Sequence, residues 1–185
     1  MLKASDQDIL SKFKNGAVRR EREEAFEMLL QKYREKMYWH IRRLVIDHDD
    51  ANDVCQNAFI KIWTNLDKFK ENSQLYTWLY RIATNEALTF LNQKKRTEAT
   101  PIETEDYDLA DQFSADPYFD GDSLQIKLQT AIALLPDKQR VVFNLRYYDE
   151  MKYEDMAQIL DTSVGALKAS YHHAAKKVEK YLTEN

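Results

Sequence analysis

Residues 153–182 read YEDMAQILDTSVGALKASYHHAAKKVEKYL and have the spacing of a helix-turn-helix. The pattern predicts a short helix over 153–160 and a longer one over 163–182. Asp161 stands in the turn between them, where a left-handed backbone is expected, and Asp tolerates that conformation better than most residues. The C-terminal end of the chain is therefore predicted to be helical.

The longer of these two helices has two different sides. At about 100° per residue, its apolar positions fall within one sector and are expected to face the core. The opposite side has no carboxylate before Glu179 and consists of Gly165, Ala169, His172, His173, Lys176 and Lys180, with Lys168 and Ser170 on its flanks. Small and basic side chains suit entry into the major groove of DNA. The alternative is an ordinary solvated face, which usually contains acids as well.

The composition extends the helical prediction to the whole chain. The 185 residues include only three Gly and three Pro, too few for a turn-rich β protein. The single cysteine, Cys55, excludes an internal disulfide and a zinc site built from several cysteines. No membrane-length apolar run and no secretory signal is visible, so a cytoplasmic location is expected.

No catalytic constellation stands out in the sequence. It contains no Gly-rich phosphate loop and no Ser or Cys in a nucleophile motif, so we expect no enzyme activity and no cofactor. The acidic cluster of Asp47, Asp49, Asp50 and Asp53 resembles a calcium loop in composition, but it lacks the Gly and the terminal Glu of an EF-hand. Capping of the following helix is the preferred interpretation, and no metal site is predicted.

The remaining helices form two groups. Hydrophobic periodicity predicts four helices in the N-terminal group, over about 5–15, 22–45, 50–66 and 75–95, with Ser5 as the first cap. In the C-terminal group, a helix over 124–135 ends at Pro136, and Asp137 is expected to cap the next.

An acidic segment separates the two groups. Residues 98–122 contain nine Asp and Glu and no Lys or Arg, whereas the flanking blocks are weakly basic. We therefore expect an all-α protein with two small helical domains, 1–97 and 123–185, joined by an acidic flexible linker over 98–122. Two interpretations of the linker stay open: an inert tether, or an acidic strand that occupies a basic channel on a partner.

Aromatic residues gather around the loop that is expected between the third and fourth helices: Trp63, Phe69, Tyr76, Trp78 and Tyr80. Alternate positions of a helix point about 200° apart, so the last three cannot all face the core. With basic side chains nearby, these rings are candidates for stacking on unpaired bases. Core packing is at least as good an interpretation for Trp78, whereas base binding is favoured for Phe69, Tyr76 and Tyr80.

Three segments together resemble a known family, the small extracytoplasmic-function (ECF) sigma factors of bacterial RNA polymerase, within the sigma-70 family. DANDVCQNAFIKIW at 50–63 is similar to the family's polymerase-binding helix, and YTWLYRIATN at 76–85 to its promoter-melting helix. LLP at 134–136, RVVF at 140–143, YEDMA at 153–157 and SVGALK at 163–168 resemble its C-terminal helix-turn-helix. The resemblance covers nearly the whole chain.

The resemblance implies three sets of site residues. Core polymerase would be gripped at its large-subunit clamp coiled coil by Asp53, Gln56, Asn57 and Phe59. The −10 promoter element would be bound by Lys61, Asn65, Phe69, Ser73, Tyr76, Arg81, Asn85 and Thr89. The −35 element would face Lys168, Ala169, Ser170, His172, His173 and Lys176, although Ser170 and His173 stand where the family often has Arg.

The resemblance also implies partners and a function. The chain would be an alternative sigma factor that recruits core RNA polymerase, through its clamp and flap, to specific promoter DNA and promotes −10 strand opening. An anti-sigma factor is an expected further partner, and the active protein would lie at the nucleoid. The rival hypotheses are a stand-alone helix-turn-helix regulator, which would need a dimer interface, and a nucleic-acid-processing enzyme, which the missing catalytic groups disfavour.

Overall fold

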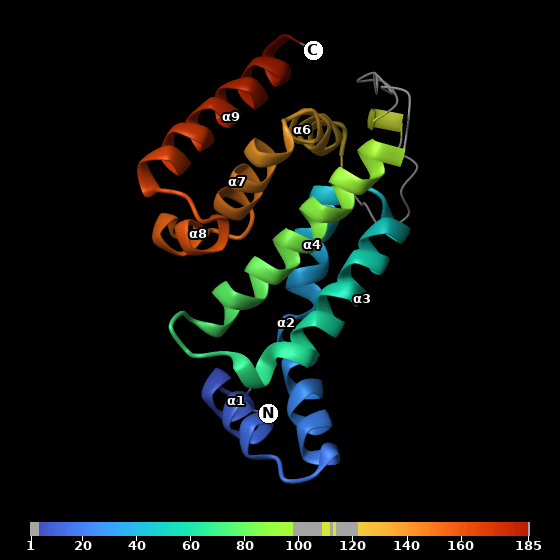
Figure 1. Cartoon of the computed structure of the whole chain (residues 1–185). Coiled ribbons are helices and arrows are strands. Elements are labelled where there is room, and N and C mark those ends of the chain that lie inside the picture. Colours follow the sequence, from blue (N-terminus) through green and yellow to red (C-terminus); the bar gives the residue numbers. More distant parts are fainter. Residues whose placement is uncertain (1–3, 98–108, 112, 114–121, 185) are drawn as a thin grey trace. The chain divides into compact units, whose positions relative to one another are not determined.

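The computed structural model describes residues 4–97, 109–111, 113 and 122–184, and every regular element in them is a helix. The chain divides into two compact units, Met1–Ala87 and Leu88–Asn185. Figure 1 shows the helices of each unit in chain order. The predicted all-α class is confirmed.

The first unit begins with α1 (Asp6–Asn15), α2 (Arg19–Val45) and α3 (His48–Asn65). A 3₁₀ turn, η1 (Leu66–Lys68), follows, and then α4 (Leu75–Thr97), which continues past Ala87. The Ser5 hydroxyl accepts from the Asp8 N–H at 3.1 Å, which confirms the predicted cap of α1. Asp47 caps α3 by accepting from the N–H groups of Asp49 and Asp50, so the acidic cluster begins a helix as expected.

Helix α2 begins three residues earlier than the prediction of about residue 22. The Glu21 carboxylate accepts from the Ala17 N–H at 2.8 Å and so satisfies a donor at the helix start. This start was not predictable from the sequence, because Val18, at the cap position, has no polar side chain to signal it.

The core of the first unit lies where α1 and α3 pack against α2. Its fully buried side chains include Phe13, Leu29, Met37, Ile41 and Ile62. His40 is also completely buried, and its Nε2 lies 2.9 Å from the Thr84 hydroxyl of α4. This polar link across the core was not predicted.

The second unit contains α6 (Ser123–Ala133), α7 (Asp137–Tyr147), α8 (Tyr153–Leu160) and α9 (Val164–Glu184). The long helix α9 packs against the other three. Buried members of its core include Ile132, Phe143, Ala174 and Val178.

The predicted cap of α7 is wrong. Pro136 occupies the cap position, and Asp137 is the first helical residue without a capping bond. Its carboxylate instead accepts from the buried Arg140 guanidinium at 2.9 Å. Arg140 also donates to the Ala133 carbonyl at 2.7 Å and thereby joins the end of α6 to the start of α7.

The turn between α8 and α9 has the predicted geometry. Asp161 adopts φ 48° and ψ 51°, a left-handed conformation, and its N–H bonds to the Ala157 carbonyl. The Ser163 hydroxyl accepts from the Ala166 N–H at 3.2 Å at the start of α9. The helix-turn-helix is therefore confirmed.

The predicted flexible linker is only partly within the described residues. Residues 98–108, 112 and 114–121 lie outside them. Residues 109–111 and 113 are helical, and Leu109 and Phe113 are buried. The other positions of the predicted linker before Asp122 stay outside the described residues, so the linker remains a prediction there.

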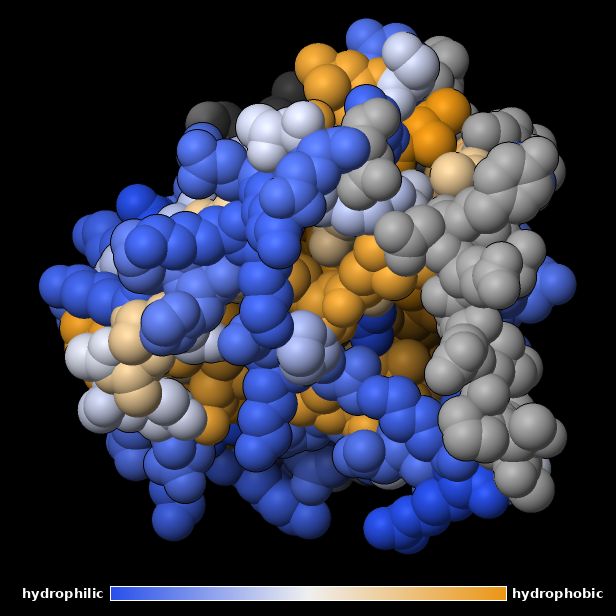
Figure 2. All heavy atoms as spheres, turned by 90° about the horizontal axis from the view of Figure 1, so that it is seen from above, coloured by the Kyte–Doolittle hydropathy of each residue, from blue (hydrophilic) through white to orange (hydrophobic). Residues whose placement is uncertain are grey.

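The described surface is mainly polar on the face drawn in Figure 2, where hydrophobic side chains show between hydrophilic ones. Among the described helices, none combines the length and apolar character needed to cross a membrane.

Candidate nucleic-acid interface

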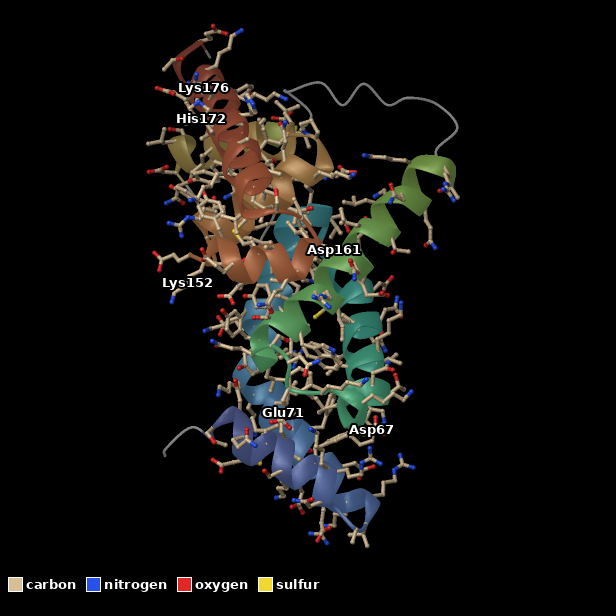
Figure 3. The ribbon with its side chains drawn as sticks, turned by 60° about the vertical axis from the view of Figure 1, so that its left-hand side comes forward. Asp67, Glu71, Lys152, Asp161, His172 and Lys176 are labelled. Atoms are coloured by element: carbon tan, nitrogen blue, oxygen red, sulfur yellow. The ribbon has the colours of Figure 1, made fainter. Side chains whose placement is uncertain are left out.

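The outward side of α9 has the predicted basic surface. Lys168, Ala169, His172, His173 and Lys176 are exposed, and Ser170 is half-buried. Leu167, Ala174 and Val178 on the opposite side are 5% exposed or less. Figure 3 shows His172 and Lys176 in succession along α9. No described residue of the second unit covers these exposed side chains, so their donors are available to a ligand.

A basic cluster around Tyr153, which was not predicted, extends this surface to α8. The Lys168 ammonium lies 5.7 Å from the centre of the Tyr153 ring, and the Arg146 guanidinium lies 5.4 Å from it. These distances are typical of cation–π contacts, which hold two cations in place. The exposed Lys152 precedes Tyr153 at the helix start (Figure 3). The cluster depends on tertiary contacts and has no signal in the local sequence.

A second surface follows α4. Arg81, Asn85 and Thr89 are exposed and succeed one another at four-residue intervals, so they share one side of the helix. Tyr76, in the first turn, is half-buried. The three polar side chains offer hydrogen-bond donors and acceptors in a row.

Two predicted aromatic contacts are not available in this conformation. Phe69 and Tyr80 are each only 5% exposed. The Phe69 ring packs on Trp78 with ring centres 5.3 Å apart, and Tyr80 lies against the buried His40. Trp78 and Tyr76 keep partial exposure, so these two rings, and not Phe69 or Tyr80, are accessible for stacking.

Lys61 and Asn65 connect α3 to this surface. The Lys61 ammonium forms an ion pair with Glu86 at 2.5 Å, so a phosphate would share this ammonium with that carboxylate or displace it. The Asn65 amide donates to the Lys61 carbonyl at 2.8 Å, and its oxygen keeps acceptor capacity. Ser73 is half-buried in the loop before α4.

A third surface lies on α3. Asp53, Gln56 and Asn57 are exposed, and their spacing of three and four residues places them in one patch. Phe59 is half-buried and lies edge-on to Phe26, with ring centres 6.5 Å apart.

An apolar pocket beside this patch was not predicted. Its volume is about 390 Å³, and Ile60 at its edge is 54% exposed. It is lined by Phe26, Leu30, Arg34, Gln56, Phe59, Ile60 and Trp63. Exposed apolar side chains beside a polar patch are typical of a protein-binding surface.

Comparison with protein families matches both units. Residues 29–97 match sigma-70 region 2, and residues 125–178 match sigma-70 region 4. The surfaces on α3 and α4 therefore lie within the first match. Most of the α9 surface lies within the second.

Sigma factors are also among the similar curated proteins. The ECF RNA polymerase sigma factor SigW of Bacillus subtilis is 33% identical over 170 residues, which cover 88% of this chain and 91% of that protein. The RNA polymerase sigma-H factor of Pseudomonas aeruginosa is 32% identical over 185 residues, which cover 96% and 93%.

Two solved structures share the fold. The sigma factor RpoE of Bartonella quintana, in complex with the anti-sigma factor NepR, has a TM-score of 0.68 at 22% identity and covers 86% of this chain and 98% of its own. CnrH, in complex with the cytosolic domain of CnrY, has a TM-score of 0.70 at 19% identity and covers 97% and 98%. These structures show the fold, and the two matched regions with the curated relatives show that the chain belongs to the ECF group of the sigma-70 family.

Proposed function

We propose that this chain is an alternative sigma factor that binds core RNA polymerase, directs it to a restricted set of promoters and opens the −10 region. One observation carries the proposal: sigma-70 regions 2 and 4 occur in order in one chain, and the surfaces on α3, α4 and α9 are exposed. Sigma factors are not enzymes, so the polymerase performs the bond-forming chemistry.

Polymerase binding is assigned to the α3 patch. Asp53, Gln56 and Asn57 would contact the clamp coiled coil of the large subunit, with Phe59 and the neighbouring apolar pocket as the hydrophobic part of the contact. A polar rim around an apolar centre is the usual composition of a protein interface. The second unit would contact the polymerase flap.

Strand opening is assigned to the α4 surface. Holding one base outside the stack costs a few kcal/mol. Stacking on an aromatic ring recovers about 1–3 kcal/mol per base, so one or two stacking contacts on Tyr76 and Trp78 would offset the cost of unstacking one base. The Asn85 amide would then select among bases, because it offers both a donor and an acceptor to a base edge. Lys61 and Arg81 would add attraction to phosphates, which does not depend on sequence.

Binding of the −35 element is assigned to α9. The exposed imidazoles and amines of His172, His173 and Lys176 would reach base edges and phosphates in the major groove. Lys168 and Arg146, held on Tyr153, would contact the adjacent backbone.

An anti-sigma factor is proposed as a regulatory partner, because the structure of RpoE with NepR shows such a complex for a protein of the same fold. The active protein is proposed to lie at the nucleoid, where its promoters are.

The test is reconstitution with core RNA polymerase that lacks any sigma factor. Adding the purified chain should produce run-off transcripts from specific start sites on genomic fragments of the source bacterium, whereas core polymerase alone should not. A stand-alone regulator would instead shift promoter fragments in gels without polymerase and would give no initiation. That result would overturn the proposal.

A further inference from the structure

The N-terminal helix α1 lies outside the matched sigma-70 region 2, which begins at residue 29. None of the surfaces described above includes a residue of α1. The helix packs against α2 and η1, so its last turn lies next to the loop that leads into α4. Two lysines, Lys12 and Lys14, occupy that last turn.

Lys14 bonds directly to this loop. Its ammonium donates to the Phe69 carbonyl at 3.0 Å and to the Glu71 carboxylate at 2.6 Å. The Gln7 side chain lies near enough to Glu71 to help lower the pKa of its carboxyl group. Gln7 and Lys14 are seven residues apart, about two helical turns, so one side of α1 supplies both contacts. Figure 3 shows Glu71 in the segment between α3 and α4.

The loop needs such contacts because its backbone is unfavourable. Glu71 has φ 58°, a left-handed conformation that residues with a Cβ atom rarely adopt. A strained residue persists only where its surroundings hold it in place. Here the surroundings are Lys14 and Gln7 on one side and the packing of Phe69 on Trp78 on the other.

We propose that Lys14 is a positioning residue for −10 recognition: it holds the loop from Phe69 to Ser73 in the shape that the base-reading surface of α4 requires. The inference rests on the proposed function. Because Phe69 packs on Trp78, a displaced loop also displaces one of the two accessible aromatic rings. A loop that is ordered before binding loses less conformational freedom when the promoter strand arrives.

The competing explanation is an ordinary surface ion pair that contributes only to stability. The chain supplies a matched control for it. Lys12, in the same turn of α1, pairs with Glu24 of α2 at 2.8 Å, and its side chain is 40% exposed against 30% for Lys14. Lys12→Ala removes the same charge from the same helix, but the Lys12–Glu24 pair does not involve the loop.

The experiment uses the full chain with core polymerase, on a promoter selected by the wild-type protein from a library with a randomised −10 region. The measured quantity is the initiation rate on the selected promoter divided by the rate on single-base −10 variants. Lys14→Ala should lower this ratio by about fivefold, the effect expected when a few ordered side chains must be ordered again on binding. Lys14→Arg, which keeps the positive charge, should keep the ratio close to that of the wild-type protein. Lys12→Ala should leave it unchanged.

Glu71→Ala should also lower the ratio, and the double variant should lose less than the sum of the two single variants, because both remove the Lys14–Glu71 ion pair. An unchanged ratio for Lys14→Ala, with a loss of thermal stability like that of Lys12→Ala, would overturn the inference. Asn85→Ala separates this failure from failure of the proposed function. If Asn85→Ala lowers the ratio and Lys14→Ala does not, only the role of Lys14 is wrong. If the wild-type protein initiates nowhere, the proposed function fails and the inference fails with it.

Discussion

At the scale of single residues, the role in −10 recognition proposed for Asn85 is the most specific. Its exposed amide lies on the same side of α4 as Arg81. We predict that Asn85→Ala reduces discrimination between −10 sequences by about tenfold, the typical loss when a good contact to a base edge is removed. Its dependence on salt should stay close to that of the wild-type protein, since no charge is lost. Permanganate footprinting on a selected promoter measures the melting.

The control is Asn92→Ala, which removes another exposed amide further along the same helix, outside the predicted set of base contacts. Normal melting with unaltered −10 preference in a folded Asn85→Ala protein would show that the Asn85 amide has no part in base recognition.

The ion pair of Glu71 leads to a prediction about pH. The Lys14 ammonium lowers the pKa of Glu71 below its ordinary value of 4.5. A carboxyl group with a lowered pKa stabilises the fold above its unfolded pKa, and this contribution is lost as the pH falls through the folded value. Lys14→Ala should therefore raise the pKa of Glu71 towards 4.5. Titration of the Glu71 carboxyl by NMR measures it, and Lys12→Ala should give no such rise.

The stability change itself should be small, because both side chains are partly exposed and solvent screens the pair. If the pKa of Glu71 were the same with and without Lys14, the bond between them would not form in solution.

Individual residues were predicted well where local rules decide them. Asp161 in its left-handed turn and the outward side of α9 follow from helix geometry alone. Burial of Phe69 and Tyr80 was missed because it depends on packing against Trp78 and His40, which no local period reveals. Lys14 and Glu71 are 57 positions apart, so their contact had no signal in the sequence.

At the scale of elements, one side of α3 packs into the core and the other side is exposed and assigned to polymerase binding. Ala51, Val54, Ala58 and Ile62 are buried, whereas Asp53, Gln56 and Asn57 face solvent. We predict that the double variant Asp53→Arg with Gln56→Ala weakens binding to core polymerase at least about thirtyfold, the loss typical of a central interface residue. The helix should remain folded, because neither side chain is buried. Fluorescence anisotropy with labelled protein measures the affinity.

Asn52→Arg is the matched control. It introduces the same guanidinium at an exposed position about 100° around the helix from Asp53, with a net charge change of +1 instead of the +2 of Asp53→Arg. Wild-type affinity in the double variant, or an equal loss in Asn52→Arg, would place the polymerase contact elsewhere on the first unit.

Element types were predictable because amphipathic periods of 3.6 residues run through every long helix. Helix starts were less so. Glu21 opens α2 without a polar cap residue, and Pro136 occupies the cap position expected for Asp137. In both cases an acidic side chain inside the helix accepts a hydrogen bond: Glu21 from an N–H before the cap, and Asp137 from the Arg140 guanidinium. Preferences for the cap residue alone do not predict such contacts.

At the scale of the whole molecule, charge is distributed unevenly along the chain. The chain carries a net charge of −4, yet nine of its acids lie in residues 98–122, between two weakly basic blocks. The two basic blocks contain the surfaces of α4 and α9 that are assigned to promoter DNA. Negative charge repels DNA phosphates, so residues 98–122 are unsuited to promoter contact and better suited to a basic surface of the polymerase.

This asymmetry supports a last prediction. Replacing the nine acids by Asn and Gln keeps the length of the segment and removes its charge. Binding to core polymerase should change little, because the α3 patch is intact, whereas promoter-specific initiation should fall because the attraction to a basic channel is lost. Run-off transcription and polymerase affinity, measured on the same preparations, separate the two effects. A control keeps Asp122, Leu109 and Phe113 in place and shuffles the other acids among the remaining non-acidic positions, so it keeps the charge and should initiate normally. Equal initiation by the neutral segment would instead identify residues 98–122 as an inert tether, whose length matters and whose charge does not.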